Sequence, residues 1–558
     1  MRPITSGPVP QQRPPRLAGR LAGKLVGAIA TCLALTGAPA GAQPQEARPD
    51  AVSAGRAPVP TATAPAAQAP AAAEKVITIQ GITEYRLPNG LRVLLGAEGS
   101  KPTLTMNLVY QVGSRHEGPG EAGMAHLLEH MLFKGTEAVP DPKQEFTSRG
   151  MRWNGTTSYD RTNYYAQFNA GQQDEDWLLG WFADTMTNIR ITPSKLDSER
   201  PVVRNEMQSS ENRPQRTLSQ QLMGAAYEFH PYGRTVIGNE SDLASVQPEQ
   251  LQSFYQRYYR PDNAVLIITG QFDEQRMLAA VGRAFASVPR PAEPISAPYT
   301  LDRAQQGERE VKLRRSGGVP LLYVAYHMMP GASREAVAMS ALTVMLTRQP
   351  DGPLYEALVK PGLAVSVYGY PISLHDPGLV QFGATFADES PREQAWQVMR
   401  ELLEEKLPLS EESLVRTKQD FANSHREVLE SPESLGIALT ESVALGDWRL
   451  FFAHADWMQD LTLEEVIAVG KRHFLRDNRT LAWYLPTEQT MRAPDPARVD
   501  VAKLLAEGLV FLQAWIIGWY GLGKLVAQFH LRGLPPKKAG YGGQHDQPQI
   551  TITKDAFA

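Results

Sequence analysis

The chain has 558 residues, 42% of them hydrophobic, and its 56 Lys and Arg nearly balance its 60 Asp and Glu, giving a formal net charge of -4. A chain of this length and composition can bury more than one core and should divide into two or three domains. The balanced charge provides no electrostatic footprint for nucleic acid or an anionic membrane, so the expected partner is a peptide, a small molecule or another protein.

The first 42 residues have the pattern of an export signal. Arg16, Arg20 and Lys24 precede the apolar run "LVGAIATCLALTGA", and small residues follow it, so we expect cleavage near Ala42 and a periplasmic mature chain. An ordinary buried helix is the alternative, and Cys32 within the run leaves a lipoprotein anchor open. Because the chain has one cysteine, the mature protein should have neither disulfides nor thiolate zinc ligands.

Residues 43–75 are rich in Ala and Pro and carry few large apolar side chains, so they should form a disordered linker. Strand-like and helix-like runs follow over 76–289, beginning with two strand runs around an Asn89-Gly90 hairpin signal. After a Pro-rich connector at 290–306, a similar series of strands and helices returns over 307–490. The pattern predicts an α+β fold in which one unit is used twice.

A metal-binding pattern lies in the first unit, in "GMAHLLEHMLFKGT" at residues 123–136. A helix turns about 100° per residue, so His126 and His130 should project from one face about 6 Å apart, where both imidazoles can reach one ion. Glu129 is placed beside them to take a proton from a water on that ion. Two histidines brought together by chance are the alternative. The corresponding helix of the second unit, "AVAMSALTV", has no metal ligands.

Zinc hydrolysis needs a third protein ligand and an open position for water. The segment "SKLDSERPVVRNEMQSSEN" offers Glu199 and Glu206 on one side of a helix, although Pro201 should kink or begin that helix. These residues resemble the family of pitrilysin, insulin-degrading enzyme and mitochondrial processing peptidase, whose zinc motif is the inverted H-x-x-E-H. The resemblance implies Zn²⁺ held by His126, His130 and Glu206. It makes Glu199 a supporting group that orients a ligand histidine, with an exposed helix charge as the alternative.

The same resemblance implies the fold, the base and a substrate-binding strand. The fold would be two homologous α/β-roll domains, each a mixed, mostly antiparallel sheet packed by helices, which form half of a clamshell. Glu129 would accept the proton of the water and pass it to the leaving amine. The stretch "GMRWNGTTSYDRTNYY" is also similar to the family and makes Asn154 and Thr157 substrate-binding residues at a sheet edge, where a peptide adds as a strand. A plain hairpin loop is the alternative for Asn154.

The chain departs from the family at two positions that should complete the site. Family members use an arginine and a tyrosine from the far half of the clamshell to bind substrate and support the oxyanion. The corresponding stretch, "DGPLYEALVKPGLAVSV", has Pro353 and Val365 there, and neither side chain can donate a hydrogen bond. We therefore expect a hetero-oligomer in which another chain supplies the pair, because a homodimer cannot supply what each copy lacks.

Residues 491–558 do not resemble the family. They include the apolar run "GLVFLQAWIIGWYGLGKLVAQF" at 508–529, in which only about fifteen residues are free of charge where a membrane span needs about 20. A membrane or interface helix, a partner-docking helix and a sequence not selected to fold all remain open. Three functions therefore stand: an exported zinc metallopeptidase that cuts unfolded peptides, a peptidase-like binding or assembly subunit without turnover, and a truncated pseudo-enzyme.

Overall fold

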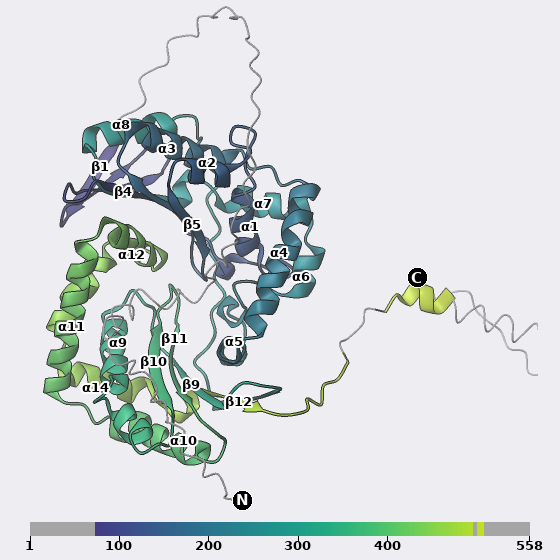
Figure 1. The fold of residues 1–558 in the computed structure, drawn as a ribbon, viewed down its shortest axis with the longest axis vertical. Coiled ribbons are helices and arrows are strands. Elements are labelled where there is room, and N and C mark those ends of the chain that lie inside the picture. The colour runs from purple at the N-terminus through teal and green to yellow at the C-terminus, as the bar shows by residue number, and fades with distance from the viewer. Residues whose placement is uncertain (1–72, 495–498, 507–558) are drawn as a thin grey trace, which may run out of the picture. The chain divides into compact units, whose positions relative to one another are not determined.

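The computed structural model describes residues 73–494 and 499–506 (Figure 1). The predicted export signal, nearly all of the predicted linker and the apolar run at 508–529 lie outside these residues. Residues up to Thr490 belong to one compact unit, and the residues after it belong to a second unit, in which 501–506 are helical. None of the described helices combines the length and the apolar character needed to cross a membrane.

The first sheet has seven strands in the order β1-β2-β3-β7-β4-β6-β5. They are β1 (Glu74–Ile79), β2 (Ile82–Arg86), β3 (Arg92–Ala97), β4 (Thr103–Tyr110), β5 (Arg152–Thr157), β6 (Thr162–Asn169) and β7 (Ala264–Gly270). All neighbouring strands are antiparallel except β3 and β7, which are parallel. Because β5 is the outermost strand on one side, its outer backbone groups pair with no other strand of the described sheet.

Side chains alternate along these strands, so the first sheet has two apolar faces. Val93 and Leu95 join one core, whereas Leu94 joins the core on the opposite face. The helices that contribute to the first core are α1 (Met124–Leu132), α2 (Pro142–Ser148), α3 (Gln172–Thr187), α4 (Pro193–Glu211), α6 (Glu240–Ser245), α7 (Pro248–Tyr258) and α8 (Glu274–Ala284).

The second sheet has five strands in the order β10-β11-β9-β12-β8, and the connector at 290–306 that precedes it contains neither helix nor strand. Its strands are β8 (Arg309–Arg315), β9 (Leu321–His327), β10 (Ser366–Ile372), β11 (Leu379–Thr385) and β12 (Arg479–Pro486). Its core includes residues of α9 (Arg334–Thr347), α10 (Arg392–Arg400), α11 (Glu411–Leu429), α13 (Leu450–Asp460) and α14 (Leu463–His473). Two sheets packed by helices confirm the predicted α+β fold.

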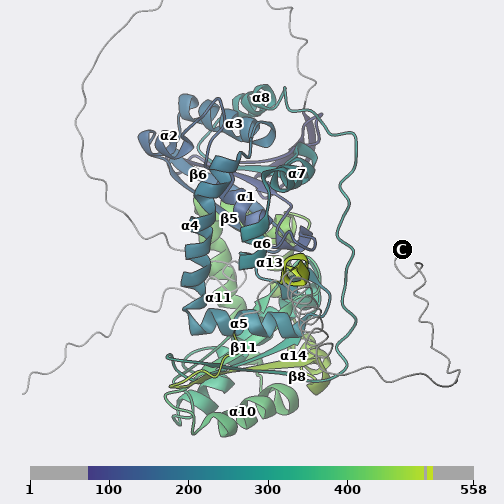
Figure 2. The same ribbon diagram turned by 90° about the vertical axis from the view of Figure 1, so that its right-hand side faces the viewer.

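The two halves exchange helices across their junction (Figures 1 and 2). The helix α5 (Pro214–Ala226), which follows the first set of helices, packs on the second sheet, where Leu218 shares a core with Tyr323. In return, α12 (Pro432–Ala444) packs on the first sheet, where Leu439 shares a core with Ile267. Each sheet therefore has one face covered by a helix from the other half.

Candidate metal centre

The helix α1 carries the two histidines of the predicted site. His126 and His130 lie one turn apart, and their ring centroids are 4.8 Å from each other. The opposite side of the helix is apolar and buried, with Leu127, Leu128 and Met131 at most 2% exposed. Burial of this side anchors the helix in the first core, so that the histidines face away from it.

The start of α1 is fixed by a buried carboxylate that sequence analysis did not single out. Glu117 accepts hydrogen bonds from the backbone N–H groups of Gly123 (3.0 Å) and Ala125 (2.9 Å). The first turn of a helix leaves such groups without partners, so Glu117 acts as their acceptor. Gly123 has a left-handed backbone with φ of 93°, and a Cβ there would lie 2.6 Å from the carbonyl oxygen of Ile237. The entry into α1 therefore requires glycine.

Glu206 approaches the two histidines from α4. Its Oε2 lies 3.6 Å from His126 Nε2 and 3.7 Å from His130 Nε2, and the three ligand atoms all lie within 4.8 Å of one another. Ligands bound at about 2.0–2.2 Å to one tetrahedral zinc ion lie about 3.4 Å apart, so these side chains fit zinc with little movement. Burial lowers the pKa of His126 to about 3, which keeps its imidazole neutral, as a metal ligand must be.

The helix α4 continues through Pro201, which was expected to kink or begin it. It runs from Pro193 to Glu211 with Pro201 inside, so the prediction that a helix begins at Pro201 is wrong. The proline removes one backbone hydrogen bond, but the remaining bonds and the buried side chains of Leu196 and Val203 hold the helix on the first core. The two glutamates of α4 thus share one helix face.

Glu199 points at the site from that face. Its Oε1 lies 2.9 Å from His130 Nδ1, and its Oε2 lies 2.8 Å from the Nζ of Lys134. Although burial raises the pKa of Glu199, its hydrogen bonds with His130 and Lys134 lower it to about 2. With Nδ1 engaged by Glu199, the Nε2 of His130 is the nitrogen left for a metal. His126 lacks such support, because its Nδ1 is buried without a hydrogen-bond partner in the part of the chain that is described.

The sequence analysis did not identify Lys134 as part of the site. Its position four residues after His130, just beyond the end of α1, was the one feature of the sequence that could have indicated it. The predicted role of Glu199 rested on the family resemblance, and the geometry gives it the contacts that such a role requires. Lys134 extends these contacts into a row of three groups, in which a cation holds the carboxylate that holds the imidazole.

Glu129 is buried between α1 and β5. The hydroxyl of Thr157 donates a hydrogen bond to its Oε2 over 2.7 Å. Burial raises the pKa of Glu129 above its ordinary value, and the charge of His130 and the Thr157 hydroxyl oppose that shift. Thr157, which the sequence predicted to bind substrate, is only 4% exposed, and its hydroxyl is bonded to Glu129. Asn154, by contrast, is exposed on β5, the outermost strand.

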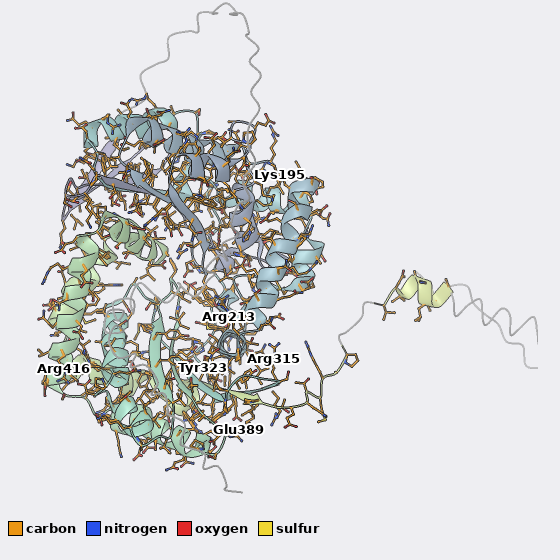
Figure 3. All side chains as sticks on the ribbon, in the orientation of Figure 1. Lys195, Arg213, Arg315, Tyr323, Glu389 and Arg416 are labelled. Atoms are coloured by element: carbon orange, nitrogen blue, oxygen red, sulfur yellow. The ribbon has the colours of Figure 1, made fainter. Side chains whose placement is uncertain are left out.

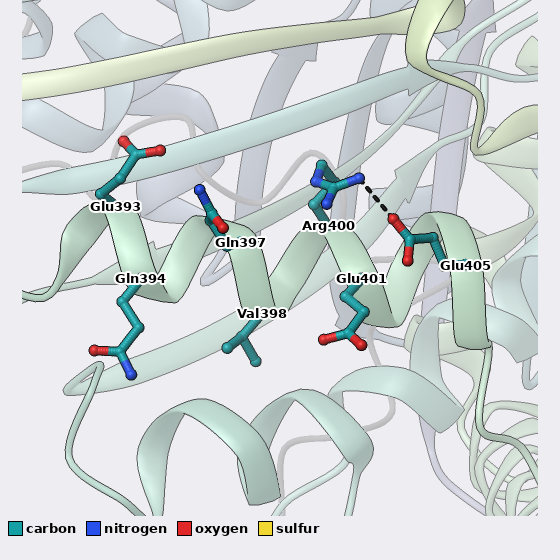
Figure 4. A pocket seen from close by; sticks show the side chains of 7 residues that line it. All are labelled: Glu393, Gln394, Gln397, Val398, Arg400, Glu401 and Glu405. Atoms are coloured by element: carbon teal, nitrogen blue, oxygen red, sulfur yellow. Dashed lines mark hydrogen bonds and ion pairs between the residues drawn. The ribbon is translucent and has the colours of Figure 1, made fainter.

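The residues at the two departures from the family lie in the second half. Pro353 precedes the short helix η4 (Tyr355–Val359), and Val365 is 60% exposed just before β10. A shallow hollow in this half, shown in Figure 4, is lined by residues of α10 and of the helical stretch η5 (Glu401–Lys406) and includes none of the candidate site residues. The candidate site therefore consists of residues from the first half alone.

Models of one peptidase family match both halves of the chain. The insulinase (peptidase family M16) model matches residues 92–240, and the peptidase M16 inactive-domain model matches residues 245–421. The zinc protease PqqE of Helicobacter pylori is 27% identical over 419 residues, which cover 72% of this chain and 92% of that protein. An uncharacterised zinc protease of Mycobacterium leprae is 32% identical over 218 residues, which cover 39% of this chain and 48% of that protein.

Solved structures share the fold. A protease from H. pylori aligns with a TM-score of 0.68 and 24% identity, over 72% of this chain and 99% of that one. The first half of the periplasmic protease PqqL from Escherichia coli aligns with a TM-score of 0.62 and 20% identity, over 74% of this chain and 94% of that half; the same fold covers 48% of complete PqqL. On the sequence matches of both halves, this chain belongs to the M16 (insulinase) family of peptidases.

Proposed function

We propose that this chain is a zinc metallopeptidase that hydrolyses unfolded peptides. The main support is the convergence of His126, His130 and Glu206 beside the carboxylate of Glu129. Zinc bound by the first three would lower the pKa of a water molecule and polarise the scissile carbonyl. Relatives named zinc proteases support the same activity.

Glu129 acts as the general base in this proposal. Its Oε2 is held by the Thr157 hydroxyl, whereas its Oε1 accepts no hydrogen bond from any described residue. Oε1 is therefore the atom that takes the proton of the attacking water and then gives it to the leaving amine. Because Glu129 is buried, its carboxylate binds a proton more readily than an exposed one.

The edge strand β5 is the proposed substrate-binding element. An extended peptide can pair with its free backbone groups, which gives affinity with limited dependence on sequence. At one end of β5 the carbonyl oxygen of Thr156 already accepts a hydrogen bond from Arg161 Nη1 over 3.1 Å. The open part of the edge therefore lies on the side of Asn154. Only an unfolded segment can lie along it, which is why the proposal specifies unfolded peptides.

A second chain is proposed to complete the substrate site. Pro353 and Val365 occupy the positions at which an arginine and a tyrosine are expected, and neither side chain can donate a hydrogen bond. The chain aligns with the first half of PqqL, and the alignment with complete PqqL covers 48% of that protein. A hetero-oligomer would supply the missing donors. The same two positions and the match to a domain named inactive also favour a second candidate, a binding or assembly subunit without turnover.

Export to the periplasm is part of the proposal. It is supported by the signal-like pattern at 1–42, and a similar chain, PqqL of E. coli, is described as periplasmic. Membrane association through 508–529 stays a prediction, because these residues lie outside those described.

Hydrolysis of a quenched, unstructured peptide by the purified, zinc-loaded chain tests the activity, with Glu129→Gln as the blank. Removing this one carboxylate should leave zinc bound and abolish turnover. Cleavage that depends on Glu129 would establish a peptidase complete in one chain and would remove the need for a partner. Zinc binding without cleavage would favour the need for a partner or the subunit without turnover, and adding candidate partner chains would separate these two.

A further inference from the structure

Three arginines gather where α4 ends and α5 begins. Arg213 is the exposed residue that precedes α5, and Arg216 lies in its first turn, where its Nη1 donates to the Oγ of Ser210 over 2.9 Å. Arg315 comes from β8 of the second sheet, and its Nη1 donates to the carbonyl oxygen of Glu211 over 3.0 Å. Figure 3 shows Arg213 and Arg315 near this end of α5. The helix exchange between the halves brings these three cations together.

The cluster of Arg213, Arg216 and Arg315 has no directly paired acid in the part of the chain that the structure describes, although the negative charge of Glu206 acts on Arg216. Among the described residues, no carboxylate forms an ion pair with any of the three. Arg216 is half-buried, and its Nη2 is buried without a hydrogen-bond partner. Burial lowers the pKa of Arg216, and the charge of Arg213 lowers it further. A cation that is partly removed from water and faces another cation is unfavourable, so an anion bound here would relieve the repulsion.

The cluster lies next to the candidate metal centre. Ser210, which holds Arg216, is one helical turn beyond Glu206 on α4, a rise of about 6 Å. Glu206 is also the acid whose charge acts on Arg216. Once Glu206 binds a divalent cation, its negative charge is committed to that ion. Arg216 then has less compensation from Glu206, so metal binding should strengthen the attraction of the cluster for an anion.

We propose that this arginine cluster binds a carboxylate of the peptide substrate, two or three residues from the bond that is cut. The proposal that this carboxylate belongs to a peptide substrate rests on the proposed function. Its distance of two or three residues from the cut bond follows from the rise of about 6 Å between Glu206 and Ser210 along α4 and from about 3.3 Å per residue of extended chain. Guanidinium groups pair with carboxylates through two parallel hydrogen bonds, so they suit this ligand better than a neutral amide. The exposed Arg213 contacts the ligand, while Arg216 and Arg315 supply the surrounding positive charge. The carboxylate is either the free C-terminus of the peptide or an acidic side chain.

Binding to the full, zinc-loaded chain carrying Glu129→Gln tests this site without requiring turnover. Fluorescent unstructured peptides would be compared by anisotropy in two matched pairs, one with a free C-terminus against its amide, the other with an internal Glu against Gln. We expect the acid of one pair to bind about tenfold more tightly than its neutral partner, as one charge-assisted hydrogen bond requires. The pair that shows the difference identifies the source of the carboxylate.

Adding Arg213→Gln should remove most of this preference, and adding Arg216→Gln the rest. Arg204→Gln is the control, because Arg204 lies on the same α4 but already pairs with Glu240 at 2.7 Å; it should keep the preference. Equal binding of acid and neutral peptides, an unchanged preference in the Arg213→Gln variant, or no peptide binding at all would each overturn the site. Arg213 is exposed, so its variant should fold even if the Arg216 variant does not. Failure to cleave in the separate activity assay would leave this result unaffected.

Discussion

The hydroxyl of Thr157 donates a hydrogen bond to Glu129 Oε2 over 2.7 Å, and this contact joins the edge strand β5 to the helix α1. It restrains the proposed base, Glu129, from the same strand that is proposed to hold the substrate. The strand β5 would therefore position both a peptide paired with it and the carboxylate of Glu129. We therefore expect Thr157 to orient Glu129, and direct contact of Thr157 with substrate stays a prediction.

Thr157→Val keeps the shape of the side chain but removes the hydroxyl, so it should lower kcat with little change in KM. A hydrogen bond to a charged group contributes about 1.5–3 kcal/mol, which corresponds to a loss of about 10- to 150-fold. Peptide hydrolysis is the measurement, in whichever assembly shows turnover that depends on Glu129. Thr157→Ser restores the donor and should recover most of the rate. Equal rates for the Val variant and the wild type would show that Glu129 does not need this bond.

Glu199→Gln should weaken zinc binding, because the amide supports the imidazole of His130 less well than a carboxylate does. Partners of this kind typically change metal affinity by about 10- to 100-fold. Lys134→Met removes the cation that holds Glu199 and should cause a smaller loss in the same direction. Competition with a chromophoric chelator measures both affinities without any substrate. An unchanged affinity in the Gln variant would return Glu199 to the alternative of a charge without a role in the site.

Helical spacing was sufficient to predict the part of the site that lies on one element. His126, Glu129 and His130 follow directly from the turn of a helix, and their shared location on α1 needs no knowledge of the rest of the chain. The joining of α1 to α4 depended on the family resemblance. Local rules favoured an interruption at Pro201, but packing of α4 on the first core outweighs the one hydrogen bond that the proline removes.

The first sheet begins with one strand more than the sequence predicted, and the residues of a turn explain the difference. The stretch from 76 to 96 was read as two strand runs around Asn89-Gly90, but it forms three strands. A two-residue turn lies at Gln80-Gly81, where φ is 45° and 84°. Both residues of such a hairpin turn have positive φ, which Asn-Gly signals clearly and Gln-Gly does not. The exchange of α5 and α12 was likewise not predictable, because it depends on contacts between residues more than a hundred positions apart.

Leu439→Ala tests that exchange by removing a fully buried side chain of α12 from the face of the first sheet. Leu439 is 0% exposed and shares its core with Ile267, so the truncation should lower the free energy of unfolding by about 2–5 kcal/mol. Denaturant unfolding is the measurement. Val415→Ala, at a position that is 63% exposed on α11, is the control and should stay within about 0.5 kcal/mol of the wild type. A similarly small effect at Leu439 would contradict the helix exchange.

The pH dependence of stability should include a contribution from His454 on α13, outside the candidate site. Burial lowers the pKa of His454 to about 4 from its ordinary 6.5, and its Nε2 has no hydrogen-bond partner among the described residues. The unfolded chain therefore takes up this proton at higher pH than the folded chain, so stability present above about pH 6.5 is lost as the pH falls toward 4. By pH 5 the loss should reach about 2 kcal/mol.

His454→Gln removes the titrating group and should reduce, by about that amount, the drop in unfolding free energy between pH 7.5 and pH 5. Both proteins would be measured with a chelator present, so that protonation of His126 and His130 contributes equally to each and cancels. A parallel pH dependence for the two proteins would mean that His454 gains its proton as easily when folded as when unfolded. Its side chain would then have to be open to water, in conflict with its 7% exposure.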